Sequence, residues 1–543
     1  MADQKRSQII GVFALLSMLP MTGCRSLPHC DSSAAAPRKP ATDPGLMSRH
    51  VIEVDADGYL VDLRPKMKGH VITHRQEVTE YLQTNIFASL HQSNKSKLLL
   101  FVHGGMNDRE QGLAHFTDDY EHVLQGEYYP VFIVWPSGWK ATYLEHLLWV
   151  RQGVKAETVN EKTFSLATTP LTFFADLGRA LTRLPLVVAN NSKSDIETIT
   201  PIRSREGGAA VKQYQEMVRT NYAVAIGDDY STPSERATHD VTYWATLPVK
   251  YIVASFLDGL GKGAWDNMLR RTQQVYPAKW NEESVQWNQR LEQTTEPAAS
   301  TPAGTRLSQT KRQERRAERY AAAGVPRFVK MLAGETNLEV TLVGHSMGTI
   351  ILNRVVRDSE INFANIVYMG AACSVEDFSH SVLPFMEQHR DTQFFNLSLH
   401  PVAEAGEWYP WLADLPPRGS LLIWIDNFLS NPVTEQERTM GRWRNLFRSD
   451  STGEPIIRRL YAEGGADLQN RLHFQAFSVG FGDKLRKMKF QWNEDPLRRD
   501  ALERCDNPLS HGELSEVPYW KPAFWWQPAI AGGKAHQAVS AAH

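Results

Sequence analysis

Residues 344–348 read Gly-His-Ser-Met-Gly, a five-residue motif whose central serine could act as a nucleophile. A strand-like run, residues 338–343, leads directly into the motif, and residues 349–353 continue from it as a helical pattern. A tight turn from a strand into a helix strains the backbone of the serine, so nothing bulky can flank it. The motif alone could arise by chance, but the strand before it and the helix after it supply the required context. We therefore predict that Ser346 is the nucleophile of an enzyme.

A second glycine turn, residues 103–107 reading His-Gly-Gly-Met-Asn, follows the apolar run 97–102. Attack on a carbonyl carbon creates an oxyanion, which backbone N–H groups can approach closely only where side chains are absent. Gly104, Gly105 or Met106 could supply one such N–H group, and Met347 could supply the other. For His103 we favour a role in shaping the turn over a role in proton transfer.

Together the two motifs resemble those of the α/β-hydrolase family, in particular its lipases and esterases with a His-Gly-Gly turn. The resemblance covers about residues 97–139 and 325–526 and leaves out the interval between them. It implies an α/β-hydrolase fold and a catalytic triad whose chain order is nucleophile, acid, histidine. Met106 stands where longer glycine runs often continue in the family, so the donating amide of this turn stays open.

The resemblance also implies a position for the histidine that accepts the proton of the serine hydroxyl. In hydrolases of this fold it lies in a loop after the last strand, and His511 occupies that position in the polar stretch 507–512. His473, His400 and His380 are the alternatives, each of which is more readily explained as a structural residue.

The acid of the triad must orient the imidazole and stabilise its positive charge. In the family it follows the strand that we predict at residues 393–399, and Glu404 stands at that place. Asp377, after the preceding strand, is the alternative, because some hydrolases carry the acid one strand earlier. Either carboxylate could instead be a solvated loop residue.

The elements that must position these residues alternate between strand-like and helical patterns. Short apolar runs typical of strands buried on both faces occur at residues 97–102, 131–135, 338–343, 365–369, 393–399 and 472–479. Helical patterns occupy residues 313–332 and 348–356, and residues 50–62 alternate around Asp57-Gly58 in the manner of a β-hairpin. Strand and helix in alternation predict the α/β class, with a mostly parallel sheet flanked by helices.

The interval 140–306 interrupts this alternation. Apolar helical stretches at residues 143–150, 171–186 and 249–260 predict a structured, mainly helical insertion, since so long a loop would be unusual. The insertion could be a cap or lid whose apolar stripes face substrate or membrane, or its helices could pack on the core, which such stripes usually do. The predicted hydrolase core then comprises residues 49–139 and 307–528, and a disordered tail follows at 529–543.

The N-terminus has the layout of a secretory signal peptide, residues 1–23, in which Lys5 and Arg6 precede an apolar run. That run, residues 9–21, is shorter than the roughly 20 residues of a membrane-spanning helix. Thr22-Gly23-Cys24 follow this run, and the segment resembles a bacterial lipoprotein signal, whose cysteine is lipidated with fatty acids such as palmitate. The resemblance implies export and a lipid anchor in the cell envelope, with a periplasmic or secreted protein as the alternative. Residues 24–48 are predicted to form a flexible tether.

Composition excludes several classes of partner and cofactor. The 59 basic and 61 acidic side chains leave a net charge of −2, which provides no polycationic surface for nucleic acid. The sequence holds no His-Glu-x-x-His, no paired Cys-x-x-Cys and no glycine-rich phosphate loop with lysine, so no metal or other cofactor is indicated. Four cysteines are too few for a disulfide scaffold; Cys373 and Cys505 could pair or could remain buried thiols.

These residues predict a serine hydrolase that cleaves carboxylic esters, lipid-like ones included, through an acyl-enzyme on Ser346. The fold does not decide the substrate, because amidases and acyltransferases use the same triad. A non-catalytic envelope lipoprotein that retains the hydrolase fold is the alternative from another class. The sequence does not indicate an oligomeric state.

Overall fold

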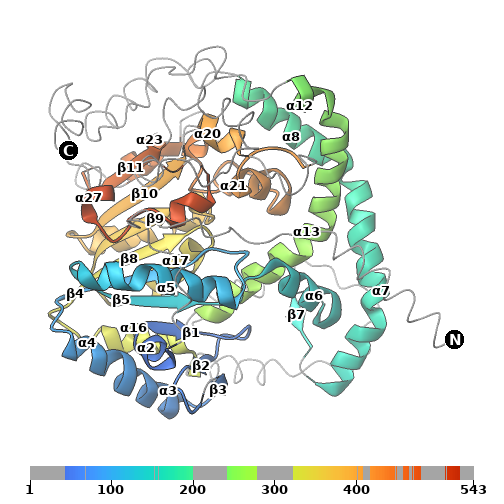
Figure 1. The fold of residues 1–543 in the computed structure, drawn as a ribbon. Coiled ribbons are helices and arrows are strands. Elements are labelled where there is room, and N and C mark those ends of the chain that lie inside the picture. The colour runs from blue at the N-terminus through green and yellow to red at the C-terminus, as the bar shows by residue number, and fades with distance from the viewer. Residues whose placement is uncertain are drawn as a thin grey trace, which may run out of the picture.

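A seven-stranded sheet, parallel throughout, forms the centre of the computed structural model (Figure 1). The structure describes residues 43–199 except 68, 152 and 157, then 241–277, 322–399, 401–407, 416–446, 448, 456–463, 468, 470–477, 508 and 510–525. In spatial order the strands are β1 (Val51–Glu53), β5 (Tyr128–Val134), β4 (Lys97–Val102), β8 (Glu339–His345), β9 (Phe363–Met369), β10 (Gln393–Leu399) and β11 (Leu472–Phe477). The predicted α/β class is therefore confirmed.

Helices cover both faces of this sheet. Those of the core are α2 (Pro44–His50), α3 (Arg75–Tyr81), α4 (Ala88–Gln92), α5 (Arg109–Gln125), α16 (Gly324–Leu332), α17 (Gly348–Asp358), α18 (Val375–Ser379), α19 (Val382–Gln388), α20 (Pro401–Gly406), α21 (Leu421–Trp424), α22 (Trp443–Leu446), α23 (Ile456–Glu463) and α27 (Pro522–Trp525). The helical turns η1 (Leu82–Phe87), η3 (Ile425–Leu429) and η5 (Gly512–Ser515) join them. The strand β4 separates two cores, because Leu98 and Leu100 pack on the side of α17 while Leu99 and Phe101 pack on the side of α5. Both faces of the central strands are thus buried, as their continuous apolar runs predict.

The start of the chain differs from the predicted pattern. Residues 50–62 form a short hairpin only next to the predicted Asp57-Gly58 turn, through the antiparallel bridge of Val54 with Leu60 and the hydrogen bond from the N–H of Asp55 to the carbonyl of Tyr59 at 2.9 Å. Away from that turn β1 pairs in parallel with β5, while β2 (Leu60–Asp62) pairs with β3 (His70–Ile72). The helix α2 begins at Pro44, inside the range predicted as a tether, and the Asp43 side chain caps it. The predicted signal peptide, Cys24 and the predicted tail lie outside the described residues.

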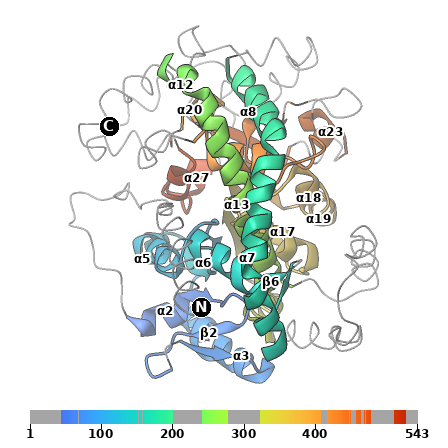
Figure 2. The same ribbon diagram turned by 90° about the vertical axis from the view of Figure 1, so that its right-hand side faces the viewer.

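The described part of the interval 140–306 is mainly helical and lies along one side of the molecule (Figure 2). Its helices are α6 (Trp139–Trp149), α7 (Val159–Thr182), α8 (Leu184–Ile199), α12 (Val241–Ala245) and α13 (Leu247–Val275), with the short strands β6 (Val150–Arg151) and β7 (Val154–Lys155). The helix α13 packs on α6, α7 and α8, and it also contacts η3 and α17, the helix that follows the predicted nucleophile Ser346. None of the helices in the described segments is both long and apolar enough to span a membrane.

Candidate active site

Ser346 occupies the turn between β8 and α17 with a backbone φ of 51°, in the left-handed region that L-residues rarely adopt. Two hydrogen bonds to neighbouring backbone hold it there. Its N–H donates to the carbonyl of Met369 at 2.9 Å, and its carbonyl accepts from the N–H of Ala372 at 3.1 Å. The side chain is only 2% exposed, and its Oγ has no hydrogen-bond partner among the described residues. The strained, buried and unpartnered hydroxyl fits the predicted nucleophile.

The two glycines of the motif are sterically required. A Cβ on Gly348 would lie 2.2 Å from the carbonyl oxygen of Val102, and a Cβ on Gly344 would lie 2.7 Å from Cδ1 of Leu352. The first contact involves backbone and cannot relax by a side-chain movement. Close approach of α17 to strand β4 therefore depends on Gly348.

The His-Gly-Gly turn lies directly beside the nucleophile. Strands β4 and β8 are parallel neighbours with Val102 opposite Gly344, so the turns that follow them meet at one edge of the sheet. A Cβ on Gly104 would lie 2.9 Å from Cβ of Ser346, and a Cβ on Gly105 would lie 2.3 Å from Sδ of Met347. Met106 adopts a positive φ of 66° at the end of this approach. The structure thus brings the predicted oxyanion residues against the predicted nucleophile.

His103 fixes the shape of that turn. Its Nε2 accepts from the backbone N–H of Trp135 at 3.1 Å, so the ring proton is on Nδ1, which donates to the Gly104 carbonyl at 2.7 Å. Burial lowers the pKa of His103 to about 3, which keeps the ring neutral. Both nitrogens are committed to backbone groups, in agreement with a structural role.

His511 lies against the backbone that holds the nucleophile. Its ring packs on Gly370, where a Cβ would lie 2.9 Å from both Cε1 and Nδ1 of the imidazole, and Gly370 has a φ of 54°. The preceding residue, Met369, is the one that accepts the Ser346 amide. The His511 side chain is 3% exposed, and neither ring nitrogen has a hydrogen-bond partner among the described residues. Burial lowers its pKa to about 4, so the ring is a neutral base that is free to accept a proton.

His345, the second residue of the motif, positions the loop that carries His511. Its Nε2–H donates to the backbone carbonyl of His511 at 3.1 Å, and the two rings lie 5.0 Å apart between centroids. Burial keeps the pKa of His345 well below its usual value, so the ring stays neutral. No pattern in the sequence marks this role, since the position between glycine and serine in the motif accepts many residue types.

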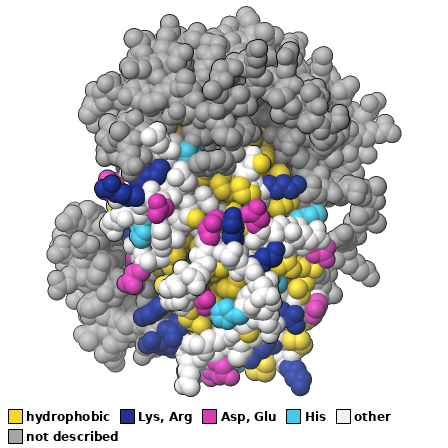
Figure 3. All heavy atoms as spheres, turned by 90° about the vertical axis from the view of Figure 1, so that its left-hand side faces the viewer, with side chains coloured by type: hydrophobic (Ala, Val, Ile, Leu, Met, Phe, Trp, Pro, Cys, Tyr) yellow, Lys and Arg dark blue, Asp and Glu magenta, His cyan; other side chains and the backbone are white. Residues whose placement is uncertain are grey.

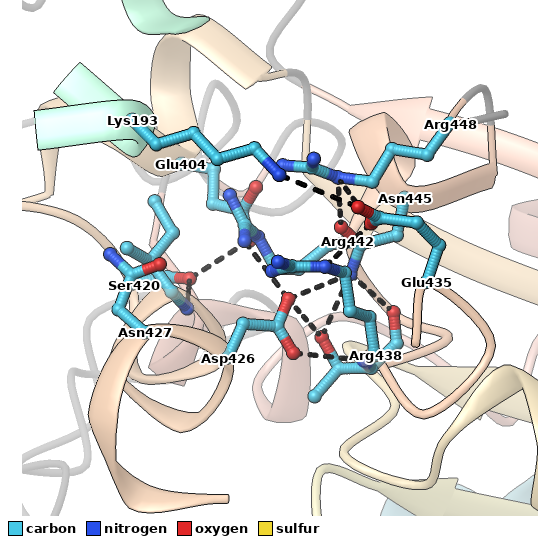
Figure 4. Close-up of polar contacts among 12 residues, drawn as sticks. Lys193, Glu404, Ser420, Asp426, Asn427, Glu435, Arg438, Arg442, Asn445 and Arg448 are labelled. Carbon is cyan, nitrogen blue, oxygen red and sulfur yellow. Dashed lines mark hydrogen bonds and ion pairs between the residues drawn. The ribbon is translucent and has the colours of Figure 1, made fainter. Parts of the chain in front are cut away.

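Glu404 is tied to an ion-paired network instead of to His511 (Figure 4). Its Oε1 accepts from Oγ of Ser420 at 2.9 Å and from Nε of Arg442 at 3.2 Å, and Arg442 continues to Asp426 at 2.9 Å. Burial raises the pKa of the Glu404 carboxyl, and the charge of Arg442 opposes that rise. Within the described residues no hydrogen bond joins Glu404 to His511. Its surroundings are those of a structural carboxylate.

The network around Glu404 joins several segments that come after β10. Asp426 on η3 accepts from the N–H of Thr439 at 3.0 Å and from the side-chain amide of Asn445 at 2.8 Å, besides Arg442. A second group centred on Glu435 lies next to it and reaches α8 through Lys193 at 3.4 Å (Figure 4). Because a buried charge is stable only when it is paired, these contacts hold the loop beyond β10 in place.

Glu407, three residues after Glu404, is the carboxylate that contacts His511. Its Oε2 accepts from the backbone N–H of His511 at 2.9 Å, and its own carbonyl accepts from Gly419 at 2.7 Å. Burial raises the pKa of Glu407 to about 8. Its position in the same predicted loop is the only sign of this role in the sequence, which does not separate it from Glu404.

Asp377, the alternative acid, lies on α18 and faces α17. Its carboxylate accepts from Asn353 at 2.5 Å and from Arg357 at 2.8 Å. These bonds join two core helices, and none connects Asp377 with His511 in the part of the chain that the structure describes.

The other candidate residues have separate surroundings. His473 shares a hydrogen bond of 2.9 Å with the side chain of Gln393 and stacks on Phe395, and His380 ends α18. Cys373 is a buried free thiol, whereas Cys505, Cys24 and His400 lie outside the described residues. No group of three or more His, Cys, Asp or Glu side chains suited to a metal ion occurs among the residues that the structure covers.

Comparison with protein-family models, with curated proteins and with solved structures finds no match. The function of this site must therefore be argued from its own geometry and chemistry.

Proposed function

We propose that the chain is a serine hydrolase with an α/β-hydrolase fold that cleaves carboxylic esters through an acyl-enzyme on Ser346. The observation that carries the proposal is the convergence of three turns at one edge of the parallel sheet. The glycine turn after β4 lies against the strained Ser346, and the neutral ring of His511 lies against Gly370, next to the Met369 carbonyl that accepts the Ser346 amide. Each supplies one of the parts that acyl transfer needs: a nucleophile, oxyanion donors and a base.

The reaction follows from these parts. Oγ of Ser346 attacks the acyl carbon while His511 accepts the hydroxyl proton, and the negative oxygen of the tetrahedral intermediate meets the N–H groups of Met347 and of Gly105 or Met106. His511 then returns the proton to the leaving alcohol as the C–O bond breaks. Water attacks the acyl-enzyme with His511 again as the base, and the acid leaves as the proton goes back to Ser346.

We propose Glu407, in place of Glu404, as the acid of this triad. The site is buried, so a positive charge on His511 during the reaction needs a nearby counter-charge. Burial disfavours the charged forms of both groups, which holds the pKa of His511 at about 4 and that of Glu407 at about 8. A proton on His511 favours the ionised form of Glu407 by attraction, and Glu407 already contacts the His511 backbone.

Both catalytic side chains are almost fully buried, so a substrate can enter only when covering segments move. Such enclosure excludes water and strengthens the electrostatic interactions of the site. We place export and a lipid anchor on Cys24 in the same proposal, on the strength of the N-terminal pattern alone.

Hydrolysis of chromogenic esters of increasing acyl chain length tests the proposed function. We expect turnover by the full chain and a loss of at least about 1,000-fold in kcat/KM for Ser346→Ala, because the nucleophile is removed. Equal low rates for both proteins on every ester, with both well folded, would assign the chain to the non-catalytic alternative. Transfer of the acyl group to an added alcohol in preference to water would instead identify an acyltransferase.

A further inference from the structure

The helices α7 and α8 lie on the outside of the molecule (Figure 2). Both helices carry large apolar side chains that are exposed. Leu171 is 70% exposed and Leu181 is 65% exposed, although both are among the side chains that usually avoid water. We call the exposed apolar set of this region the insertion face; it consists of Phe164, Leu166, Leu171, Phe174 and Leu181 on α7, Leu186 and Ile196 on α8, Trp244 on α12, and Val249, Ile252 and Phe256 on α13.

The exposed apolar residues of α7 lie along one side of the helix. Phe164, Leu171, Phe174 and Leu181 follow one another at intervals of seven, three and seven residues, which places them along a single stripe of α7. Between Thr163 and Ala189 the charged side chains are Asp176, Arg179 and Arg183, which are only 13%, 29% and 21% exposed. At 1.5 Å per residue this stretch extends over about 40 Å of helix.

Charged side chains near the middle of this surface form ion pairs with the inner helix α13, whereas Lys162 and Lys193 near its two ends are exposed. Asp258 on α13 is 0% exposed and pairs with Arg179 at 3.4 Å and with Arg183 at 3.0 Å. Asp195 on α8 likewise accepts hydrogen bonds from the hydroxyls of Tyr243 at 2.9 Å and Tyr251 at 2.8 Å. A helix on a water-exposed surface normally shows the reverse arrangement, with charges outside and apolar residues inside. These helices are therefore adapted to an apolar exterior.

The opposite side of the molecule lacks this pattern. There basic, acidic and apolar side chains are interspersed over the described surface (Figure 3). Surfaces of mixed charge keep proteins soluble, whereas a large apolar patch marks a docking site. Among the described residues, Met67 and Val433 are the exposed large apolar side chains that lie outside the insertion.

We infer that the insertion face docks on a lipid bilayer, with α7 and α8 lying in the plane of the membrane surface. A protein partner would call for a polar rim and matched charges around an apolar centre, whereas the insertion face stays uncharged over most of its length. A bilayer needs no matched partner, and apolar helix faces enter it to a depth of about 5–10 Å. The lipid predicted on Cys24 would hold the chain at such a surface, because about 65 Å of extended chain at most separates Cys24 from α2. The exposed Trp244 suits the boundary between headgroups and acyl chains.

Docking also connects the membrane to the candidate active site. The helix α13 contributes Val249, Ile252 and Phe256 to the insertion face and contacts α17 further along its length. An ester that resides in the membrane would then be drawn from the surface on which α13 rests.

A site-specific fluorophore tests this inference in the full chain. Phe174→Cys, in a background of Cys24→Ser, Cys30→Ser and Cys505→Ser, is labelled with an environment-sensitive probe and mixed with phosphatidylcholine vesicles. We expect the emission to rise and shift to the blue, because the probe enters the acyl region, and we expect 1 M NaCl to leave the change intact, because no charge attracts the face to lipid. The control is Val433→Cys, an exposed apolar position outside the insertion, whose emission should stay constant.

Substitution of the neighbours completes the test. Leu171→Glu with Leu181→Glu in the labelled protein should weaken the vesicle response by at least about tenfold in lipid concentration, since each buried leucine contributes several-fold to partition. Both positions are exposed, so the fold, followed by circular dichroism, should be unchanged. A probe that does not respond to vesicles, or one that responds to protein concentration in their absence because a second copy covers it, overturns the inference. Docking needs no turnover, so Ser346→Ala protein should respond equally, and failure here leaves the hydrolase proposal standing.

Discussion

The buried polar groups at the edge of the sheet differ from those between the helices of the insertion. At the edge, Ser346 and His511 are neutral and their reactive atoms are unpartnered within the described chain, whereas Asp258 of the insertion is charged and paired with two arginines. Unpaired buried groups cost stability and are retained where they react, whereas paired ones fix the positions of helices. Pairing with an opposite charge therefore distinguishes Asp258, which links helices of the insertion, from the proposed catalytic residues Ser346 and His511.

The same contrast occurs within a single loop. Glu404 and Glu407 lie three residues apart beyond β10, yet Glu404 is held by Arg442 and Ser420 while Glu407 contacts His511. We assign structure to the first carboxylate and catalysis to the second. The predictions that follow, taken from the largest expected effect to the smallest, test whether that division holds.

Replacement of His511 should have the largest effect. His511→Asn removes the base, so we expect kcat/KM for a chromogenic ester to fall by about 10,000-fold or more, with a smaller effect on stability. His473→Asn is the matched control, because His473 is also a buried neutral histidine but bonds to Gln393. Equal losses of kcat/KM in the two variants would show that burial, and not base catalysis, explains the effect at His511.

The two glutamates should respond in opposite ways to the same change. We expect Glu407→Gln to lower kcat by roughly 100-fold to 10,000-fold, because the counter-charge of the imidazolium is lost, while the free energy of unfolding changes little. Glu404→Gln should instead lower the free energy of unfolding by about 3–5 kcal/mol, because Arg442 loses part of its buried counter-charge, and should leave the kcat of folded protein nearly unchanged.

Denaturant unfolding and ester hydrolysis, measured on both glutamate variants, show which glutamate acts in catalysis and which one stabilises the fold. A kcat loss confined to Glu404→Gln would reverse the assignment. A stability loss without a kcat loss in both would leave the triad without an acid from this loop.

Substitution of Gly370 should have an intermediate effect on activity. Gly370→Ala places a methyl group 2.9 Å from the His511 ring and strains a residue at φ 54°, so the imidazole must shift and kcat should fall by about 10-fold to 100-fold. Gly153→Ala is the control, since Gly153 also has a positive φ of 74° but no atom within 4 Å of the added methyl. Both variants should lose about 1 kcal/mol of stability from backbone strain, and only the first should lose activity.

The pH dependence should separate the base from its counter-charge. The base must be neutral, and burial lowers the pKa of His511 to about 4, so the loss of kcat/KM that reports the base should lie near pH 4. A separate change near pH 8 should report protonation of Glu407 and should be absent in Glu407→Gln. A halving near pH 6.5 would show that the free enzyme carries an exposed, ordinary histidine as its base.

The free energy of unfolding should also depend on pH, because burial changes the pKa values of two other histidines. The pKa values of His103 and His473 are lowered to about 3, so the unfolded chain binds more protons than the folded one below pH 6.5. The contribution of these two histidines to the free energy of unfolding should therefore be fully present above pH 6.5 and should decline as the pH falls towards 3. The raised pKa of Glu407 contributes with the opposite sign, and its contribution is lost as the pH rises towards 8. Thermal melts across this range measure the decline.

The sheet was the most predictable part of the protein because its strands are continuous apolar runs. Residues 97–102 and 393–399 were predicted as strands, and β4 and β10 have those bounds. The hairpin predicted at residues 50–62 forms only next to its turn. Alternation along a segment does not identify the partner of a strand, and β1 pairs with β5, some 80 residues away. Local patterns thus predict the strands themselves better than their pairing.

The site was predictable only where backbone geometry restricts the residue type. The turns around Ser346 and Gly104 require glycine, and those glycines are visible in the sequence. The choice between Glu404 and Glu407 depends instead on where Arg442 and His511 meet the loop, and those residues lie 38 and 104 positions away. The outward orientation of the apolar stripe of α7 was hidden for a similar reason, because such a stripe looks the same whether it faces a core or a membrane.

Labelling with a fluorophosphonate probe tests the central claim most directly, because the probe forms a covalent bond only with an activated serine. The account predicts one adduct per full-length chain, mapped by mass spectrometry to the peptide that contains Ser346, absent in Ser346→Ala and formed far more slowly in His511→Asn. An adduct at another serine, or none on protein that is folded by circular dichroism, would contradict it.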